Sequence, residues 1–370
     1  MTDPRDLAEL ERLGFYDAGA PDAEDRRRLL QWILELGGTV EEIGRAASIG
    51  KLGTLALDLA MRPPGETVDL NDFVEHSGFD PALVRRLWRA LGLPESGPLP
   101  VRVTPDTASA LRFLIAMSAR FDEGTAFAIA RVMGSSAARI AEALSSAVRV
   151  EVEVPDLLAG TAYSDVVREY SLAGRDVLPF FLATLDAVVR RHMIVVSSQL
   201  WSTDADKAAV SLERTVGFAD LVGSTAVVRG GSVAAMITML RRFEEMVWDL
   251  VTAAGGRVVK LIGDEAMFVV ADAVQACDLS LALTETSPVA LRVGLACGAV
   301  SGIYGDYYGE PVNLAARLVG AAEPSTVVVS AAVRRAAGET FGFDALPARS
   351  LKGFAEPVVP HRLRQRREPG

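Results

Sequence analysis

The sequence predicts two domains of different class, an all-α domain followed by an α+β domain with a ferredoxin-like βαββαβ order of elements. The first reason is length, because 370 residues exceed one ordinary core at roughly 150 residues per domain. The second is pattern: apolar residues up to about residue 175 have helical spacing, whereas β-rich segments alternate with helical ones after Val210. The composition, 50% hydrophobic and 23% charged, is that of a folded globular protein.

Residues 1–175 are expected to form an irregular helical domain. Four residue pairs have the spacing of helix N-termini, as capping boxes or as a capping side chain before proline: Thr39/Glu42, Asp69/Asp72, Asp80/Pro81 and Thr104/Pro105. Residues 62–65 and 93–100 contain the glycines and prolines that separate helices. No fixed-period repeat is visible, which argues against a solenoid. Residues 176–205 predict one apolar-rich connecting helix, which is stiff enough to transmit a motion, rather than a flexible linker.

Residues 206–366 are expected to form the α+β domain, and residues 367–370 a disordered tail. The expected strands are 214–221, 257–262, 266–271, 291–298, 326–331 and 357–363. The expected helices are 223–254, 273–284 and 312–320. Residues 263–265 predict a tight turn between two of these strands, and a loop is expected around Asp306.

Composition and charge argue against several classes of protein. The two cysteines, Cys277 and Cys297, lack the paired spacing of a zinc site or a disulfide framework. The formal net charge of −10 disfavours a nucleic-acid partner. No membrane span is expected, since the most apolar stretch, residues 177–196, contains Pro179 and several charges. The acidic first residues do not resemble a signal peptide, so a cytoplasmic location is expected.

One segment, residues 71–95, resembles the helix-turn-helix opening of MerR-type regulators. In that interpretation Arg85, Arg86 and Arg89 lie on the second helix, where they would contact DNA. The alternative is an ordinary helical pair, with its apolar residues inward and the arginines in solvent. The acidic net charge favours the helical pair.

Two acidic residues stand out by position. Asp220 ends a predicted strand and Asp264 lies at the tip of a predicted hairpin. If the two strands are neighbours, both carboxylates project at one sheet edge, and with the Leu221 carbonyl they form an oxygen-only site suited to Mg²⁺ or Mn²⁺. Two such ions can hold the attacking and leaving oxygens of a phosphoryl displacement. Alternatively, both residues are ordinary turn aspartates.

Three stretches resemble, in order, the signature of class III nucleotide cyclases: VGFADLVGST, KLIGDEAMFVV and GDYYGEPVNLAARLVG. The spacing within them is demanding, with a lysine four residues before Asp264 and an aspartate seven before Asn313. The resemblance covers roughly residues 210–365. It implies that Asp220, Asp264 and the Leu221 carbonyl hold two divalent ions, Mg²⁺ or Mn²⁺.

The resemblance also implies the substrate-binding residues. Lys260 and Asp306 match the pair that selects the base, and a lysine donor with an aspartate acceptor fits adenine, hence ATP. Asn313 and Arg317, one helical turn apart, would orient the ribose and stabilise the transition-state phosphoryl oxygens. Lys352 matches a triphosphate-binding lysine. Two hydroxyl residues also lie where a helix N-terminus can meet phosphate, or where they simply cap the helix: Ser224 and Thr225.

The short GIYGDYYG segment resembles a short-arm subgroup of bacterial homodimeric cyclases, in which the two sets of site residues face each other across a subunit interface. A homodimer with two equivalent sites is therefore expected, and a monomer should be inactive. The domain layout also resembles the mycobacterial pH-sensing adenylate cyclases, whose N-terminal domain inhibits or permits catalysis. His192, in the connecting helix, is the candidate regulatory residue, because histidine changes charge near neutral pH. The alternative is an exposed histidine without a role.

The leading functional hypothesis is therefore an adenylate cyclase that makes 3′,5′-cyclic AMP and pyrophosphate from ATP. A guanylate or diguanylate cyclase is one alternative, because IGDEA is similar to the GGDEF loop of diguanylate cyclases, although the second glycine is missing. A nucleotide-responsive DNA-binding regulator with a degenerate cyclase half is another. The filled catalytic positions argue against degeneracy.

Overall fold

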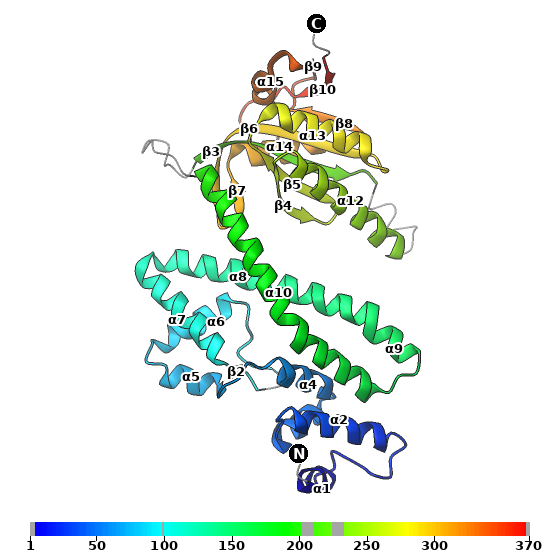
Figure 1. Cartoon of the computed structure of the whole chain (residues 1–370). Helices are drawn as coiled ribbons and strands as arrows, with labels where there is room; N and C mark the ends of the chain where they lie inside the picture. The colour runs from blue at the N-terminus through cyan, green and yellow to red at the C-terminus, as the bar shows by residue number, and fades with distance from the viewer. Residues whose placement is uncertain (1–3, 98–99, 201–210, 224–232, 368–370) are drawn as a thin grey trace. The chain divides into compact units, whose positions relative to one another are not determined.

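The computed structural model describes residues 4–97, 100–200, 211–223 and 233–367, and the chain divides into two compact units, residues 1–200 and 201–370 (Figure 1). Each unit is considered by itself. Among the described residues, no helix is long and apolar enough to cross a membrane. Both cysteines are free thiols, as expected, and burial raises the pKa of Cys277 to about 12.

The first unit is helical apart from a pair of two-residue strands, β1 (Val68–Asp69) and β2 (Arg102–Val103). Its helices are α1 (Pro4–Arg12), α2 (Ala23–Glu35), α3 (Val40–Ser48), α4 (Leu52–Met61), α5 (Leu70–His76), α6 (Pro81–Ala90), α7 (Pro105–Arg120), α8 (Glu123–Val148), α9 (Val154–Leu158) and α10 (Tyr163–Leu200). A π-helical turn, Arg149–Glu153, joins α8 to α9.

The helix starts were largely predictable. Thr39 and Glu42 form the expected capping box at α3, and Asp80 and Thr104 cap the helices that begin at the prolines following them. Asp69 differs from the expectation, because its carboxylate accepts the amide of the second residue of α5, Asn71, and forms a simple cap. The reason is that a short Asp in place of Glu at the third position reaches the N-cap amide poorly.

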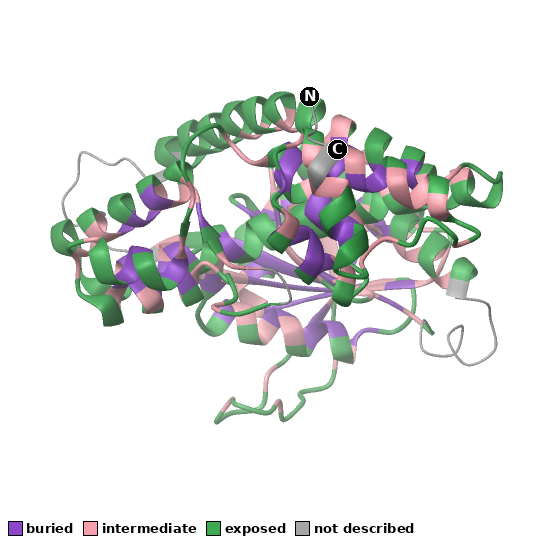
Figure 2. Ribbon diagram, turned by 90° about the horizontal axis from the view of Figure 1, so that it is seen from below, coloured by how far each residue is buried: buried purple, intermediate pink, exposed green. Residues whose placement is uncertain are grey.

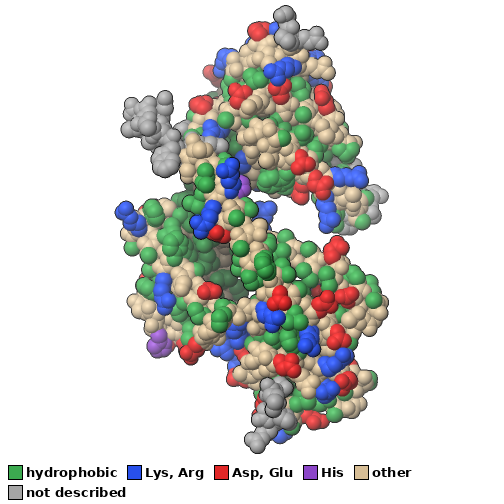
Figure 3. Space-filling model, viewed as in Figure 1, with side chains coloured by type: hydrophobic (Ala, Val, Ile, Leu, Met, Phe, Trp, Pro, Cys, Tyr) green, Lys and Arg blue, Asp and Glu red, His purple; other side chains and the backbone are tan. Residues whose placement is uncertain are grey.

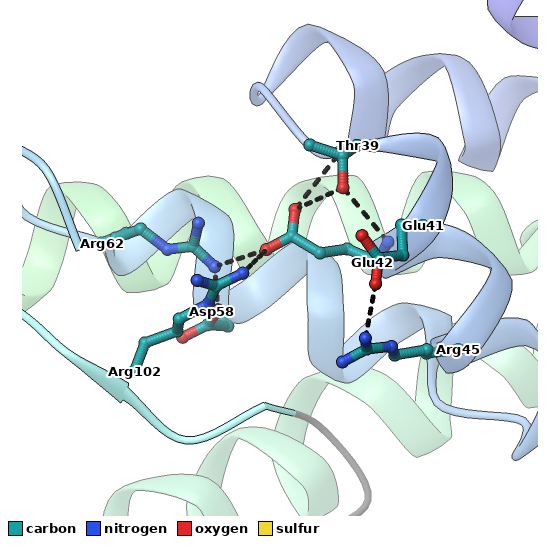
Figure 4. A network of polar contacts seen from close by, with 7 residues as sticks. All are labelled: Thr39, Glu41, Glu42, Arg45, Asp58, Arg62 and Arg102. Carbon is teal, nitrogen blue, oxygen red and sulfur yellow. Dashed lines mark hydrogen bonds and ion pairs between the residues drawn. The ribbon is translucent and has the colours of Figure 1, made fainter. Parts of the chain in front are cut away.

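A buried carboxylate ties three segments of the first unit together (Figure 4). Glu42 is only 8% exposed; one of its oxygens accepts the amide and the hydroxyl of Thr39, at 3.1 and 3.2 Å. The other oxygen lies 3.6 Å from Arg62, after α4, and 3.7 Å from Arg102, in β2. Two arginines and a cap therefore compensate the cost of burying this charge.

Helix α10 begins at Tyr163, so the expected boundary between residues 175 and 176 falls inside a continuous helix. Pro179 lies within α10, and the helix continues past it. The N-terminal part of α10 packs against the first core, to which Val167 belongs. The packing of the first turns of α10 against this core, rather than the apolar pattern near residue 176, determines where the helix starts.

The second unit has the expected α+β class (Figure 1). Its strands are β3 (Ser211–Leu221), β4 (Arg257–Ile262), β5 (Glu265–Val270), β6 (Leu291–Ile303), β7 (Asp306–Tyr308), β8 (Thr326–Val329), β9 (Phe341–Ala345) and β10 (His361–Arg366). Its helices are α12 (Val233–Ala253), α13 (Ala273–Thr286), α14 (Glu310–Ala321) and α15 (Ala331–Ala337). The sheet order is β4-β5-β3-β6-β8-β10-β9, with β7 paired to β6.

Three of these elements were not predicted as such: β7 replaces the loop expected at Asp306, and α15 and β9 are additional. Arg367, which was expected to begin a disordered tail, instead donates its backbone amide to Thr340 and pairs with Glu339, and residues 368–370 lie outside the described residues.

The sheet carries a separate core on each face. One core gathers α12, α13 and α15 over residues such as Ala219 and Leu221 of β3. The other places α14 over Val216 and Phe218 of the same strand. Alternate residues of one strand thus point to opposite cores, as the two-residue period of a strand requires. Figure 2 shows the buried residues concentrated in the strands and on one side of the flanking helices.

The buried histidine His361, in β10, gives a pH-dependent stability. Burial, with a contribution from Arg334, lowers its pKa, and the backbone at Val359 opposes this only partly. The folded state therefore disfavours the protonated form. Its stabilising effect is present above the ordinary histidine pKa of about 6.5 and is lost as the pH falls below it.

We accordingly expect the thermal midpoint of the wild-type chain to fall between pH 7.5 and 5.5 more steeply than that of His361→Gln. His192→Gln, at an exposed histidine, is the matched control and should follow the wild type. Identical slopes for wild type and His361→Gln in differential scanning calorimetry would contradict the assignment.

Candidate active site

Asp220 lies in the centre of the sheet, one residue before β3 ends. It pairs in register with Glu265 of β5 on one side and Arg292 of β6 on the other. Directly paired residues of antiparallel strands share a face, so the three side chains lie in a row. Asp220 and Arg292 form an ion pair, and both side chains are largely buried.

Asp264 lies in the turn between β4 and β5, beside the end of β3. Gly263 before it has φ +66°, a conformation that glycine adopts without steric cost. The backbone carbonyl of Asp264 accepts the amide of Leu221 at 3.1 Å, so the turn and the strand end are directly linked. Because β3 and β5 are neighbours, the two aspartates lie at the same end of adjacent strands.

The pKa of Glu265, which follows Asp264 in this cluster, is raised above its ordinary value. Burial is the main cause, and the charges of Asp220 and Asp264 add to it, while Arg292 opposes them. Such an excess of carboxylate oxygen fits a hard divalent cation. Among the described residues, however, no three His, Cys, Asp or Glu side chains converge as a ready metal site. Further ligands would have to be backbone or substrate oxygens.

Lys260 and Asp306 come together as a second polar group. Lys260 Nζ, in β4, lies 2.5 Å from Asp306 Oδ2, in β7, and both side chains are about one-third exposed, at 39% and 30%. The other carboxylate oxygen of Asp306 accepts the amide of Tyr307 at 2.8 Å. The structure thus pairs two residues that are 46 positions apart in the sequence.

Asn313 and Arg317 lie one turn apart on the exposed face of α14. The inward face of the helix carries Ala315 and Val319, which pack on the sheet. In the described part of the chain, neither Asn313 nor Arg317 has a side-chain hydrogen bond or ion pair. One chain therefore shows no contact between this pair and Asp220 or Lys260.

The remaining predicted residues lie further apart. Lys352 is exposed in the segment between β9 and β10, next to Leu351, which packs under Leu318 and Val328. His192 is exposed on α10 in the first unit. Ser224 and Thr225 lie outside the described residues.

Comparison with known proteins shows similarity to nucleotide cyclases over both units of the chain. The family model of the adenylate and guanylate cyclase catalytic domain matches residues 209–364, and that of the adenylate cyclase regulatory domain matches residues 10–193. An adenylate cyclase of Streptomyces coelicolor is 33% identical over 264 residues, covering 69% of this chain and 68% of its own. The chain belongs to the class III nucleotide cyclase family.

Two relatives align with nearly the whole cyclase. An uncharacterised protein of Mycobacterium tuberculosis is 32% identical over 370 residues, covering 98% of this chain and 95% of its own. A protein of the same species named as a pH-sensitive adenylate cyclase is 27% identical over 370 residues, covering 94% and 90%. The similarity to these two proteins therefore spans both units of this chain.

The helix-turn-helix interpretation is not supported by the regulatory part of the cyclase. Arg85 and Arg89 share Glu95, and Arg86 pairs with Glu123, so all three arginines are engaged within the domain. Val84, Leu87 and Trp88 are buried, as the helical-pair alternative predicted. On the face that Figure 3 shows, acidic and basic side chains are interspersed.

Sequence reasoning missed three charged residues of the site: Glu265, Arg292 and Arg257. Glu265 follows Asp264 directly, so its position was visible in the motif. Arg292 and Arg257 are ordinary strand residues in the sequence, and only strand register and a bulge bring them to the site.

The position of α14 depends on Gly294 of β6. A Cβ atom there would lie 2.3 Å from the amide nitrogen of Val319 and 2.5 Å from the carbonyl oxygen of Ala315. These are backbone atoms of α14 and cannot move independently. The helix that carries Asn313 and Arg317 therefore rests directly on a glycine.

We expect Gly294→Ala to lower the free energy of unfolding by about 1–3 kcal/mol, as overpacking of a core does. Gly320→Ala, in α14 itself, is the matched control, because a Cβ atom at that position has no heavy atom within 4 Å. Urea unfolding of both variants tests this, and equal midpoints for the two would refute the close contact.

Proposed function

We propose that this class III cyclase is an adenylate cyclase, which converts ATP to 3′,5′-cyclic AMP and pyrophosphate. The family includes enzymes for both purine nucleotides, so the choice of base needs its own argument. The observation that carries it is the Lys260–Asp306 pair: a cationic donor and an anionic acceptor, 2.5 Å apart and partly exposed. Relatives named as adenylate cyclases support the same choice.

Lys260 would donate to N1 of adenine, and Asp306 would accept from the exocyclic amino group. Guanine presents the opposite polarity at this edge, with a donor at N1 and an acceptor at O6. A guanine base would leave both partly buried charges without a matching partner, which is strongly disfavoured. The pair therefore selects ATP.

Asp220, Asp264 and the Leu221 carbonyl would hold two divalent ions, Mg²⁺ or Mn²⁺. The residues fit such ions, because all donors are oxygens and the carboxylates of Asp220 and Asp264 lie close enough to Glu265 to add to the effect of burial on its pKa. When bound, the ions acidify the ribose 3′-hydroxyl and neutralise charge on the triphosphate. Arg292 holds one side of Asp220 and leaves the rest of the carboxylate for other partners.

The reaction needs no protein nucleophile. The ribose 3′-oxygen forms a bond to the α-phosphorus, the bond from that phosphorus to the bridging oxygen breaks, and pyrophosphate leaves while the hydroxyl proton passes to water. Asn313 would orient the ribose for this in-line attack. Arg317, which has no acidic partner in the described structure, would stabilise the phosphoryl oxygens, and Lys352 the triphosphate.

The active form would be a homodimer with two equivalent sites at the subunit interface. Support comes from the exposed side chains of Asn313 and Arg317 on α14. In the described residues, neither side chain has a hydrogen bond or ion pair with the other predicted site residues. A twofold dimer can set the acids of one subunit against the α14 helix of the other. The first unit would then regulate catalysis, in line with the match of residues 10–193 to the regulatory domain family.

The first test is cyclic nucleotide formation by the purified chain with Mn²⁺, given ATP or GTP. We expect cyclic AMP from ATP, strong preference over GTP, and at least about a 100-fold loss in Asp220→Ala, more than loss of an outer-shell group costs a metal site. Asp344→Ala, at an exposed acid paired with Arg364, is the control and should keep wild-type activity. Cyclic GMP as the main product would refute the base assignment.

Mixing two inactive variants tests the dimer. Asp220→Ala and Arg317→Ala should each be inactive, yet random heterodimers contain one intact site of two. Because half of the dimers are mixed, about a quarter of the wild-type activity should return. No recovery after confirmed subunit exchange would mean that each chain builds its own site.

His192 tests regulation by pH. Because the imidazole gains a charge on protonation, His192→Ala should flatten the dependence of activity on pH between 5.5 and 8 if the connecting helix responds to that charge. An unchanged profile would leave His192 as an exposed residue without a role.

A further inference from the structure

The turn that presents Asp306 has an unfavourable backbone conformation. Ile303 and Asp306 pair across a two-residue turn, in which Tyr304 has φ +52° and Gly305 has φ +86°. Both turn residues are in the left-handed region, which suits a tight hairpin. Glycine adopts this region freely, but for tyrosine it is strained, so neighbouring structure must hold the turn.

Arg257, at the start of β4, supplies that support. Its Nη2 atom donates to the carbonyl oxygen of Gly305 at 2.8 Å, across 48 positions of sequence. Its guanidinium also lies over the ring of Tyr307, 5.7 Å from the centroid, where a cation–π attraction operates. The arginine thus contacts the residues on both sides of Asp306.

A β-bulge brings Arg257 to the same side as Lys260. Arg257 pairs with Val269 of β5, and Lys260 pairs with Met267, so three steps along β4 match two along β5. In a regular strand, residues three apart point to opposite faces. The extra residue between Val258 and Lys260 reverses this relation and places both cations on the face that Val269 and Met267 share.

We propose that Arg257 is a positioning residue for base selection, which holds the β6–β7 turn so that Asp306 stays in register with Lys260. Lys260 then contacts the base, while Arg257 contacts the Gly305 carbonyl and the Tyr307 ring, on either side of Asp306. The proposal rests on the proposed adenylate cyclase function and deepens it by adding a residue that sets specificity without touching the nucleotide.

The experiment measures kcat and KM of the full-length chain with ATP and GTP for Arg257→Ala and Arg257→Lys. Affinity for 3′-deoxy-ATP, which lacks the attacking hydroxyl, is measured alongside by calorimetry. We expect Arg257→Ala to raise the KM for ATP and the dissociation constant of 3′-deoxy-ATP about ten-fold, the order that loss of a charge-assisted hydrogen bond produces. The ATP/GTP ratio of kcat/KM should fall by a similar factor with kcat nearly unchanged, and Arg257→Lys, which keeps a donor, should recover part of both.

Arg364→Ala is the matched control, because Arg364 is an exposed strand arginine that pairs with Asp344 in β9. Thermal melts check that all variants are folded. A wild-type KM and ATP/GTP ratio in Arg257→Ala, while Asp306→Ala changes both, would overturn the positioning role and leave the adenylate cyclase function standing. Unchanged ratios in Asp306→Ala and Lys260→Ala as well would overturn base selection itself, and the positioning role with it.

Discussion

The catalytic unit depends on the register of β3, the strand between β5 and β6. Because side chains alternate, this register directs Phe218 and Asp220 toward the α14 face and Ala219 and Leu221 toward the opposite core. A slip of one residue would exchange the two sets, burying a carboxylate and exposing core side chains. The same pairing sets Arg292 beside Asp220 and fixes the charge at the candidate metal site.

Two glycines fix this register by shape. Gly217 of β3 lies opposite Phe268, whose ring occupies the space where a Cβ would stand, at 2.1 Å. On the other face, Gly294 lies opposite Phe218 and lets the backbone of α14 approach. The ring of Phe268 can lie against β3 only where β3 has a glycine. In a shifted register, the ring would clash with the side chain of a neighbouring residue. Steric fit and hydrophobic alternation therefore select the same pairing.

Local chemistry was predictable from the sequence, and long-range geometry was not. The turn at Asp264, the spacing of Asn313 and Arg317 on one helix, and the caps at Thr39 and Thr104 depend on neighbours within four residues. The bulge before Lys260 depends on a register shift against β5, which no periodicity in β4 reveals. The start of α10 was missed for the same reason, since its first turns are stabilised by packing on α2 and α4.

Charge gives the physical reason for proposing a two-subunit site. At the end of β3, the charges of Asp220 and Asp264 act on Glu265, with Arg292 opposing them, and such a group of carboxylates favours a cation. Arg317 and Lys352 are exposed cations for which the described residues provide no acidic partner, so they favour an anion. A nucleoside triphosphate with divalent ions carries both charges: its ions would bind the acidic group at the end of β3, and its phosphates would bind Arg317 and Lys352. One nucleotide can do this only where the acidic and the basic residues lie together. In the described residues Arg317 has no hydrogen bond or ion pair with Asp220, and in the proposed dimer a second copy would supply the missing half of the charge pattern.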